Sequence, residues 1–374
     1  MKQRAFNILL TVLFCLFIGG MFLGSLILPD RDFSQLENRK LAQTPALSLE
    51  NITTGKFMED AEDYVNDQIL GRDFWVALKA WSERVSGKQE NNGVYFAKED
   101  TLISRVDTPS QSDLEENAGY VNALVNNVDV PVYFGIIPSA AEIWSDRLPE
   151  GAPTADEKAI IDRLYNEVQT HTIDLYSALA QHKDEDLYYR TDHHWTSLGA
   201  FYGYTALMDA MGLEAVPLDE SQKVTVSEDF YGTLFSSSGV RWLPPDHIDR
   251  YISDEGVTVT AYPNGTPEPG SLYVDSYLEV KDKYSSFLGG NKPLCVIETK
   301  HTDAPKVLVI RDSYADSLAP FLTQNFSEIH LFDPRYNLTS VKDYVTQNEI
   351  DSVVVLYSIS NFTARDNQMF VLGR

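Results

Sequence analysis

Cysteine is scarce in this sequence: Cys15 and Cys295 are the two in 374 residues. Cys15 lies in an apolar N-terminal run and Cys295 far downstream, so we expect no disulfide, which leaves the compartment open. Basic residues are also few, with 30 Lys and Arg against 55 Asp and Glu, and the formal net charge is −25. A surface this acidic repels phosphate backbones, so we expect no nucleic-acid partner. The chain has no internal repeat and no long block of like charge.

The apolar stretch at the N-terminus predicts a membrane helix. Lys2 and Arg4 precede a run from Ile8 to Leu28, whose length matches the hydrocarbon core of a bilayer, about 30 Å. The run ends in LILPDRDF and has no A-x-A cleavage site, so we expect an uncleaved signal anchor. The basic residues keep the N-terminus in the cytoplasm and place the rest outside. The alternative is a cleaved signal peptide, and it also exports the bulk of the chain.

Hydrophobic periodicity divides the chain into three parts. Residues 1–28 form the cytoplasmic N-terminus and transmembrane signal anchor, and residues 29–85 form a tether and a helical segment that Gly71 splits in two. Residues 86–374 form the main domain, with a β-rich insertion around 216–300. Apolar runs of strand length at 130–138, 306–310, 328–334 and 352–358 alternate with helical patterns. We therefore predict an α/β fold with a parallel sheet flanked by helices.

Capping signals predict the ends of two helices. Thr154 with Glu157 three residues later forms a capping box for a helix over TADEKAIIDRLYNEVQTH. Thr196 and Gly212 are expected to begin and end the helix over TSLGAFYGYTALMDAM.

Ser313 lies in VLVIRDSYADS, where a buried strand gives way to a helix. Side chains at the carboxyl end of a parallel strand project into the crevice where α/β proteins hold their sites. The helix N-terminus behind it offers free N–H groups for an oxyanion. Ser313 is therefore a candidate nucleophile, and the alternative is that it only caps the helix.

Asp192, His193 and His194 are adjacent in YYRTDHHWT. In extended backbone Asp192 and His194 point the same way and could serve a serine as acid and base, while a turn would allow His193 instead. In a second interpretation the cluster binds zinc. Adjacent histidines do not easily reach one ion, and the chain has no H-x-x-x-H or C-x-x-C, so we expect no metal. In a third interpretation the cluster is structural, with Trp195 in the core.

The segment YYRTDHHWTSLGA resembles the signature of the DHHW family of exported bacterial proteins. That family is similar to the alginate O-acetyltransferase group, whose members share an SGNH-hydrolase-like domain. The resemblance extends to the N-terminal anchor, SQLENRKLAQTPAL, YVNDQILGRDFW and RDSYADS. In those enzymes a D-x-H motif lies upstream of the nucleophilic serine. The resemblance therefore implies that Asp192 orients His194, that His194 is the base and that Ser313 attacks.

The nucleophile block departs from the usual G-D-S, because Arg311 replaces the glycine while Asp312 is kept. The backbone N–H of Ser313 remains available, but the shape of the loop differs. Gly232 in DFYGTLF is our candidate for the glycine that lends an oxyanion N–H. Asn361 in LYSISNFT is the candidate asparagine of the third block, and the alternative is a turn residue.

HLFDPRYN also ends a predicted strand, so Asp333, Arg335 and Tyr336 could reach the same crevice. Arg335 could hold an anionic sugar group or pin Asp333. A structural ion pair within the loop is the alternative.

The resemblance implies a single-pass, membrane-anchored O-acetyltransferase that acts outside the cytoplasm and needs no cofactor. Ser313 would take acetyl from a multispanning membrane acyltransferase and pass it to a hydroxyl of a cell-surface or secreted polysaccharide. Two alternatives stay open: a carbohydrate acetylesterase with the same triad, and a non-catalytic glycan-binding or scaffold protein, which the unusual RDS block favours. The sequence leaves the identity of the polysaccharide open.

Overall fold

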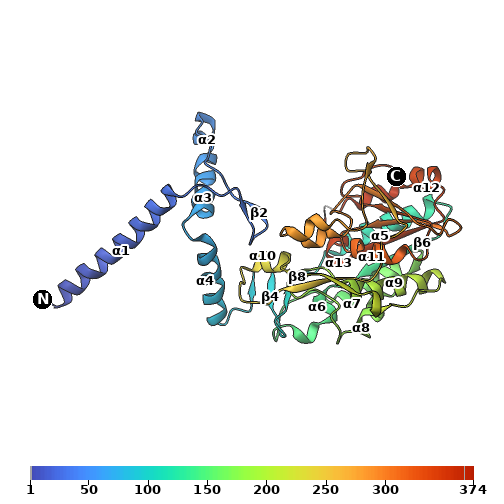
Figure 1. The fold of residues 1–374 in the computed structure, drawn as a ribbon, viewed down its shortest axis with the longest axis horizontal. Coiled ribbons are helices and arrows are strands. Elements are labelled where there is room, and N and C mark those ends of the chain that lie inside the picture. The colour runs from blue at the N-terminus through green and yellow to red at the C-terminus, as the bar shows by residue number, and fades with distance from the viewer. Residues whose placement is uncertain (1, 366) are drawn as a thin grey trace. The chain divides into compact units, whose positions relative to one another are not determined.

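The computed structural model describes residues 2–365 and 367–374, and the chain forms two compact units. Unit 1 contains the residues up to Asn91 together with Phe235–Trp242. Unit 2 contains Asn92–Leu234 and Leu243–Arg374. In Figure 1 the chain is coloured from blue at α1 to red at the C-terminus, and the red elements belong to unit 2.

Unit 1 begins with α1 (Lys2–Ile27), which is long and apolar enough to cross a membrane by length and composition. Such a helix near the N-terminus is either a membrane anchor or a signal sequence. The predicted helical segment is split in two: the first helix ends at Gln68, and Gly71, at φ 68°, is the N-cap of the second. The unit's elements are α1, β1 (Phe33–Ser34), β2 (Arg39–Lys40), α2 (Leu49–Thr53), α3 (Lys56–Gln68), α4 (Arg72–Val85) and β3 (Glu90–Asn91).

The main sheet of unit 2 has the strand order β11-β10-β12-β14-β13-β15-β6-β7. Neighbours from β14 to β7 are parallel, and those from β14 to β11 are antiparallel. The strands are β6 (Val132–Ile137), β7 (His171–Thr172), β10 (Thr258–Ala261), β11 (Glu268–Pro269), β12 (Leu294–Glu298), β13 (Lys306–Arg311), β14 (Glu328–Phe332) and β15 (Ser352–Ser358). The predicted α/β class with a parallel sheet is confirmed, and the antiparallel extension was not foreseen.

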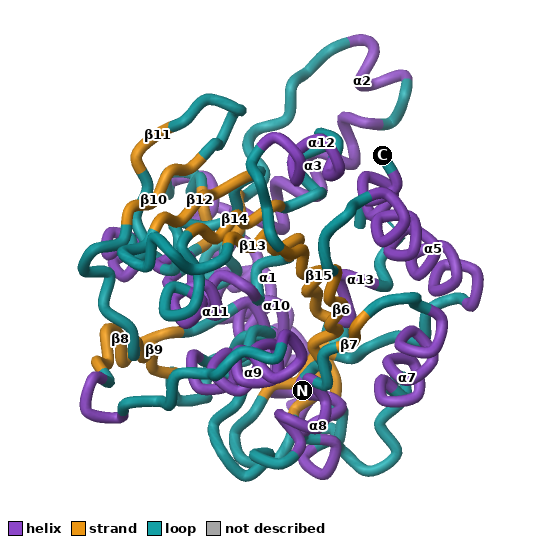
Figure 2. Tube along the Cα trace, turned by 90° about the vertical axis from the view of Figure 1, so that its right-hand side faces the viewer, coloured by secondary structure: helices purple, strands orange, loops and turns teal. Residues whose placement is uncertain are grey.

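Helices cover both faces of this sheet, which explains why its central strands read as unbroken apolar runs. Figure 2 shows α5 (Gln111–Asn127) and α7 (Glu157–Glu167) on one side of the sheet, with α9 (Ser197–Met211) and α11 (Ala315–Leu322) on the other. β15 is buried along its whole length, and β13 from its second residue onward. The carboxyl ends of β13 and β15 therefore stand side by side in a rigid core.

The helix ends follow one capping prediction and contradict the other. Thr196 caps α9, and Gly212 ends it at φ 69°, as predicted. α7 begins at Glu157, and its N-cap is Asp156, so the prediction of Thr154 was wrong. The two candidates are two residues apart, and the buried Glu157 side chain turns away to another segment rather than closing a capping box.

The remaining elements of unit 2 are short. β4 and β5 form an antiparallel hairpin, and β8 pairs with β9. The bounds are β4 (Val94–Phe96), β5 (Leu102–Ser104), α6 (Ala140–Ile143), α8 (Leu175–Ala180), β8 (Val224–Phe230), β9 (Asp246–Arg250), α12 (Val341–Gln347) and α13 (Ile359–Phe362), with 3-10 turns η1 (Ser145–Arg147), η2 (Glu220–Gln222), η3 (Asp275–Glu279), η4 (Lys283–Ser286) and η5 (Met369–Gly373); α10 (Thr233–Ser238) belongs partly to each unit.

Candidate active site

Ser313 lies in the turn between β13 and α11, and the residue before it holds that turn in place. One oxygen of the buried Asp312 carboxylate accepts the Tyr314 N–H at 3.0 Å. The other accepts the Ser358 N–H at 2.9 Å, the Ser358 hydroxyl at 2.6 Å and the Asn361 amide at 2.8 Å. The serine turn is thus fastened to the end of the neighbouring strand β15. Asn361 lies at the site, and its amide group holds Asp312.

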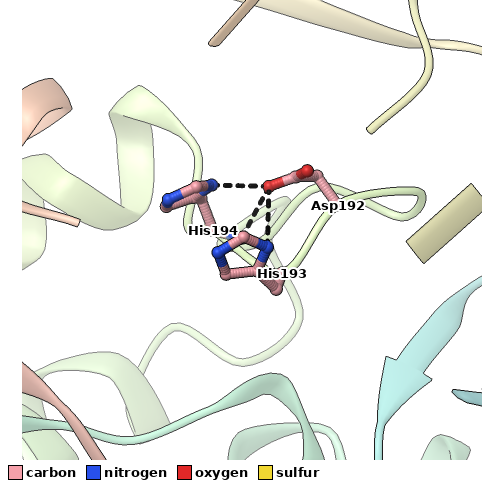
Figure 3. A group of neighbouring side chains, drawn as sticks. All are labelled: Asp192, His193 and His194. Carbon is pink, nitrogen blue, oxygen red and sulfur yellow. Dashed lines mark hydrogen bonds and ion pairs between the residues drawn. The ribbon is translucent and has the colours of Figure 1, made fainter. Parts of the chain in front are cut away.

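The Asp192 carboxylate is the centre of the second half of the site. Figure 3 shows the rings of His193 and His194 both beside it. Asp192 Oδ1 lies 2.6 Å from His194 Nδ1 and accepts the His194 backbone N–H at 3.0 Å. Asp192 Oδ2 accepts the N–H and the hydroxyl of Thr233 at 2.7 Å and 3.0 Å. The His193 Nδ1 atom lies 2.7 Å from the Thr233 hydroxyl and 3.6 Å from Asp192 Oδ1.

The two halves meet at His194, whose Nε2 lies 2.8 Å from the Ser313 hydroxyl oxygen. An acid, an imidazole and a hydroxyl are therefore in one hydrogen-bonded line, although the serine is 119 residues from the histidine in sequence. Ser313 does not cap α11, because the N-cap position is Tyr314 and no side chain makes a cap bond there. No described residue accepts a hydrogen bond from the Ser313 N–H, which is the geometry that an oxyanion donor needs.

Three aromatic residues join the aspartate–histidine segment to the serine turn. The Trp195 indole N–H donates to the Tyr314 carbonyl at 2.8 Å, and the Tyr314 hydroxyl donates to the His193 carbonyl. The ring of Tyr284 lies flat on the ring of His194, with centroids 3.8 Å apart and planes 10° apart. Its hydroxyl donates to the Ser313 carbonyl at 3.0 Å. The structural role expected of Trp195 and the histidine–serine contact thus coexist.

The charges at the site favour an ionised Asp192 and a neutral His193. Burial raises the pKa of the Asp192 carboxyl, but His193, His194 and the Thr233 N–H outweigh it and hold the pKa below its usual range. Desolvation and the neighbouring His194 lower the pKa of His193. A carboxylate fixed in this way can orient His194 and stabilise the positive charge that the ring acquires when it takes a proton.

The unusual arginine of the RDS block is fully buried. Arg311 Nη1 lies 2.9 Å from Asp316 Oδ1, on the first turn of α11, and 4.0 Å from Asp333 Oδ2, just beyond β14. Burial nevertheless raises the pKa of Asp316 to about 6, because the arginine offsets only part of the desolvation. Arg311 therefore links the serine helix to the next strand from inside the protein.

The structure gives Arg335 one of its two expected roles, the contact that pins Asp333, and leaves Tyr336 at the surface. The Arg335 guanidinium makes a bidentate pair with Asp333, at 2.9 Å and 2.7 Å, so its donors serve a loop ion pair. Tyr336 is 55% exposed. Across the described residues, neither side chain makes a hydrogen bond or ion pair with the aspartate, histidine or serine of the site. The alternative of a structural ion pair is the one that the structure contains.

Gly232 lies at the site but not in the expected role. Its N–H donates to the Thr191 hydroxyl at 3.2 Å, so it is not directed at Ser313 as an oxyanion donor. A Cβ at this position would lie 2.2 Å from the Cβ of Asp192. Only glycine allows this close approach, which brings the following N–H, that of Thr233, onto the Asp192 carboxylate.

A cavity of about 150 Å³ opens beside this group of residues. Its walls combine Asp192, His193, Tyr314 and Asn361 with the hydroxyls of serines from the ends of β5, β6 and β15. Hydroxyl and amide groups of this kind suit a small polar ligand such as part of a sugar. The lining residues are Ser104, Ser139, Ala140, Ala141, Asp192, His193, Leu234, Tyr314, Ser358, Ser360 and Asn361.

The same cluster bears on the metal question. Asp192, His193 and His194 each offer a ligand atom, and these atoms lie within 4.8 Å of one another, so adjacency alone does not keep both rings from one ion. The 2.6 Å contact of Asp192 Oδ1 with His194 Nδ1 is a hydrogen bond, whereas two ligands of one tetrahedral zinc stand more than about 3 Å apart. An ion would have to break that bond, and the absence of zinc stays a prediction.

Thr233 and Tyr284 are the supporting residues that sequence reasoning missed. Thr233 holds Asp192, and Tyr284 contacts both the base and the serine turn. Both come from segments between the DHHW motif and the serine, and neither lies in a motif. Only the tertiary fold brings them to the site.

A family model described as DHHW protein matches residues 108–332, more than half of the chain. The chain belongs to the DHHW family. No curated protein matches its sequence. The match includes both the Asp192–Trp195 segment that spells the family's name and Ser313.

Solved structures share the fold of this DHHW protein. A crystal structure of a DHHW family protein from Eubacterium siraeum is 26% identical, with a TM-score of 0.66 over 75% of this chain and 95% of that one. PatB1 from Bacillus cereus, solved with a sulfonyl adduct, is 21% identical, with a TM-score of 0.63 over 74% and 98%. The O-acetyltransferase domain of Pseudomonas putida AlgJ is 15% identical, with a TM-score of 0.47 over 73% and 93%. The first two of these structures confirm the α/β fold with a parallel sheet flanked by helices.

Proposed function

We propose that this DHHW protein is an extracytoplasmic, membrane-anchored O-acetyltransferase that modifies a polysaccharide through an acetyl-serine intermediate. The observation that carries the proposal is the line from Asp192 through His194 to Ser313, with contacts of 2.6 Å and 2.8 Å. A hydroxyl at this distance from an oriented imidazole is the arrangement that activates a serine for acyl transfer. The family's resemblance to the alginate O-acetyltransferase group supports acetyl as the acyl group.

The proposed reaction has two matched halves. Ser313 Oγ attacks the acetyl carbonyl of an ester donor while His194 Nε2 takes its proton, and the donor alcohol leaves with that proton as the C–O bond breaks. A sugar hydroxyl then attacks the acetyl-serine, His194 takes its proton, and Ser313 recovers a proton when the acyl bond to it breaks. The Ser313 N–H is the first donor to the oxyanion in both halves. The Asn361 amide, which lines the cavity, is the second candidate.

The proposed setting follows from α1. If α1 anchors the chain with its N-terminus inside, unit 2 has no access to cytosolic acetyl-CoA. The acetyl group must then come from a partner, for which we propose a multispanning membrane acyltransferase. The acceptor is a cell-surface or secreted polysaccharide, and no cofactor takes part.

The direct test is the intermediate. Ser313→Ala should abolish acetyl release from 4-nitrophenyl acetate and leave the melting temperature within a few degrees of wild type, because it removes one hydroxyl oxygen from the cleft. A mass gain of about 42 Da on the Ser313 peptide of the wild type would mark the acetyl-enzyme. PatB1 has been solved with a sulfonyl adduct, so we also expect Ser313 to react with a sulfonyl fluoride. Ser112→Ala, at an exposed position on α5, is the matched control.

The outcomes separate the proposal from its rivals. Transfer of acetyl to an added glycan supports the transferase, whereas release to water alone, unchanged by acceptors, identifies an acetylesterase with the same residues. Full esterase activity in Ser313→Ala would remove the serine mechanism. If the wild type also lacked any reaction with esters and sulfonyl fluorides, it would be a binding or scaffold protein.

A further inference from the structure

Helix α4 in unit 1 carries an apolar stripe that the protein leaves uncovered. The stripe consists of Phe74, Leu78, Trp81 and Val85, which are 61%, 39%, 55% and 66% exposed. Spacings of four, three and four residues place them within about 60° of the helix circumference. A contiguous row of large exposed apolar side chains marks an interaction surface rather than ordinary protein surface.

The other sides of α4 are different in character. Ala80 is buried within the unit, and Lys79 and Glu83 form a charged pair at 4.0 Å away from the stripe. One face is therefore packed, one is charged and one is apolar. A helix with aromatic and aliphatic residues on one side and charges on the other is suited to lie in the plane of a membrane interface.

Contacts with α1 place the start of α4 beside the apolar helix. The Leu70 N–H, two residues before α4, donates to the Ser25 hydroxyl near the end of α1 at 2.9 Å. Within α4, the ring of Trp75 meets the ring of Phe17 edge-on, with centroids 6.0 Å apart. Phe17 lies about 12 Å further back along α1 than Ser25. The start of α4 therefore runs back beside α1, toward its N-terminal half.

If α1 anchors the chain as proposed above, we propose that α4 lies against the bilayer that α1 enters, with the α4 stripe in contact with its acyl chains. Helix α1 is the apolar helix of membrane-spanning length in the described chain, so a helix that turns back along it is brought to the same lipid. Phe74, Leu78 and Trp81 are residue types found on the lipid-facing side of membrane-associated helices. The proposal does not depend on the catalytic function proposed above.

The test uses the full chain, with Cys15→Ser to remove the label site in α1, in bilayers of phosphatidylcholine. Spin labels on Leu78→Cys and Val85→Cys report the stripe, and labels on Lys79→Cys and Glu83→Cys are the matched controls on the charged face. We expect the stripe labels to be more accessible to oxygen than to a nickel chelate, and the control labels to show the reverse.

A second measurement needs no cysteine. Trp75→Phe first removes the tryptophan that contacts α1. Brominated lipids should then quench part of the remaining tryptophan fluorescence, and a further Trp81→Phe should remove most of that quenched part. Stripe labels with the water accessibility of the controls would overturn the proposal. Stripe labels shielded from both reagents would also overturn it, and would identify a protein surface, such as a second copy, as the cover.

Discussion

Tyr284, in η4, contacts both the proposed base and the turn that holds the proposed nucleophile. Its ring stacks on His194 at 3.8 Å, and its hydroxyl donates to the Ser313 carbonyl at 3.0 Å and lies 3.1 Å from the Ser317 hydroxyl. Burial raises the pKa of Tyr284 well above its usual value, so the phenol stays neutral. The face of a neutral phenol attracts a cation, and His194 becomes cationic whenever it takes the serine proton.

Two substitutions separate the hydroxyl from the ring. Tyr284→Phe keeps the stack and removes the hydroxyl. The Ser313 carbonyl still accepts the Asp316 N–H at 3.2 Å, so the loss of stability should be about 1 kcal/mol. Tyr284→Leu also removes the stack and leaves a partial cavity, for a loss of about 2–4 kcal/mol. A lost cation–π contribution of about 1–2 kcal/mol corresponds to roughly a five- to thirtyfold fall in kcat.

The assay is the release of 4-nitrophenol from 4-nitrophenyl acetate, with kcat and KM measured separately and the folded fraction taken from thermal melting. We expect kcat to fall for Tyr284→Leu, to change little for Tyr284→Phe, and KM to hold in both, because the ring acts through His194 rather than on substrate. Tyr273→Phe, which loses a similar 2.8 Å bond to a backbone carbonyl elsewhere in the insertion, controls for general destabilisation. A folded Tyr284→Leu variant with wild-type kcat would refute the reasoning.

Gly232→Ala should lower the melting temperature and kcat together, because the added Cβ would overlap Asp192. Gly119→Ala on α5 is the control and should lower neither, because a Cβ there meets open space. Equal melting temperatures of the two variants would contradict this reasoning. Burial raises the pKa of Glu157 to about 7 from 4.5, so the folded state binds the extra proton and stability from this group falls as pH rises from about 4.5 to 7, by about 3 kcal/mol. Glu157→Gln should remove that part of the pH dependence of thermal melting, and an unchanged slope would show that the carboxyl titrates normally.

The core of the fold was predictable because it depends on local patterns. Buried parallel strands need continuous apolar sequence, and β13 and β15 have it over most of their length. The residues Asp192, His194 and Ser313 were predictable because they sit at ends of elements, in a motif with a recognisable family. Their contact across 119 residues was expected from the resemblance, and the structure has it at 2.8 Å. Their catalytic roles stay predictions.

The surroundings of the site were not predictable, because they depend on long-range packing. Gly232 was expected to offer its N–H to an oxyanion, but the Thr191 hydroxyl accepts that N–H. The site depends instead on the absence of a side chain at Gly232, because a Cβ there would overlap Asp192. Arg335 was placed at the right strand end, and there its Nε and Nη2 donate to both oxygens of Asp333. Tyr284 comes from a turn in the insertion, and no local pattern distinguishes it from the chain's other tyrosines.

The two edge strands of the main sheet affect how copies of the protein interact when they are crowded together. Strands β11 and β7, which close it, are two residues long, and β11 ends in Pro269, which has no N–H to offer a further strand. Long unpaired strands invite edge-to-edge association between molecules, and these edges offer almost none. Copies held by α1 in one membrane, as proposed, would meet at high local concentration on a single plane. The short edges let them collide there without joining their sheets into aggregates.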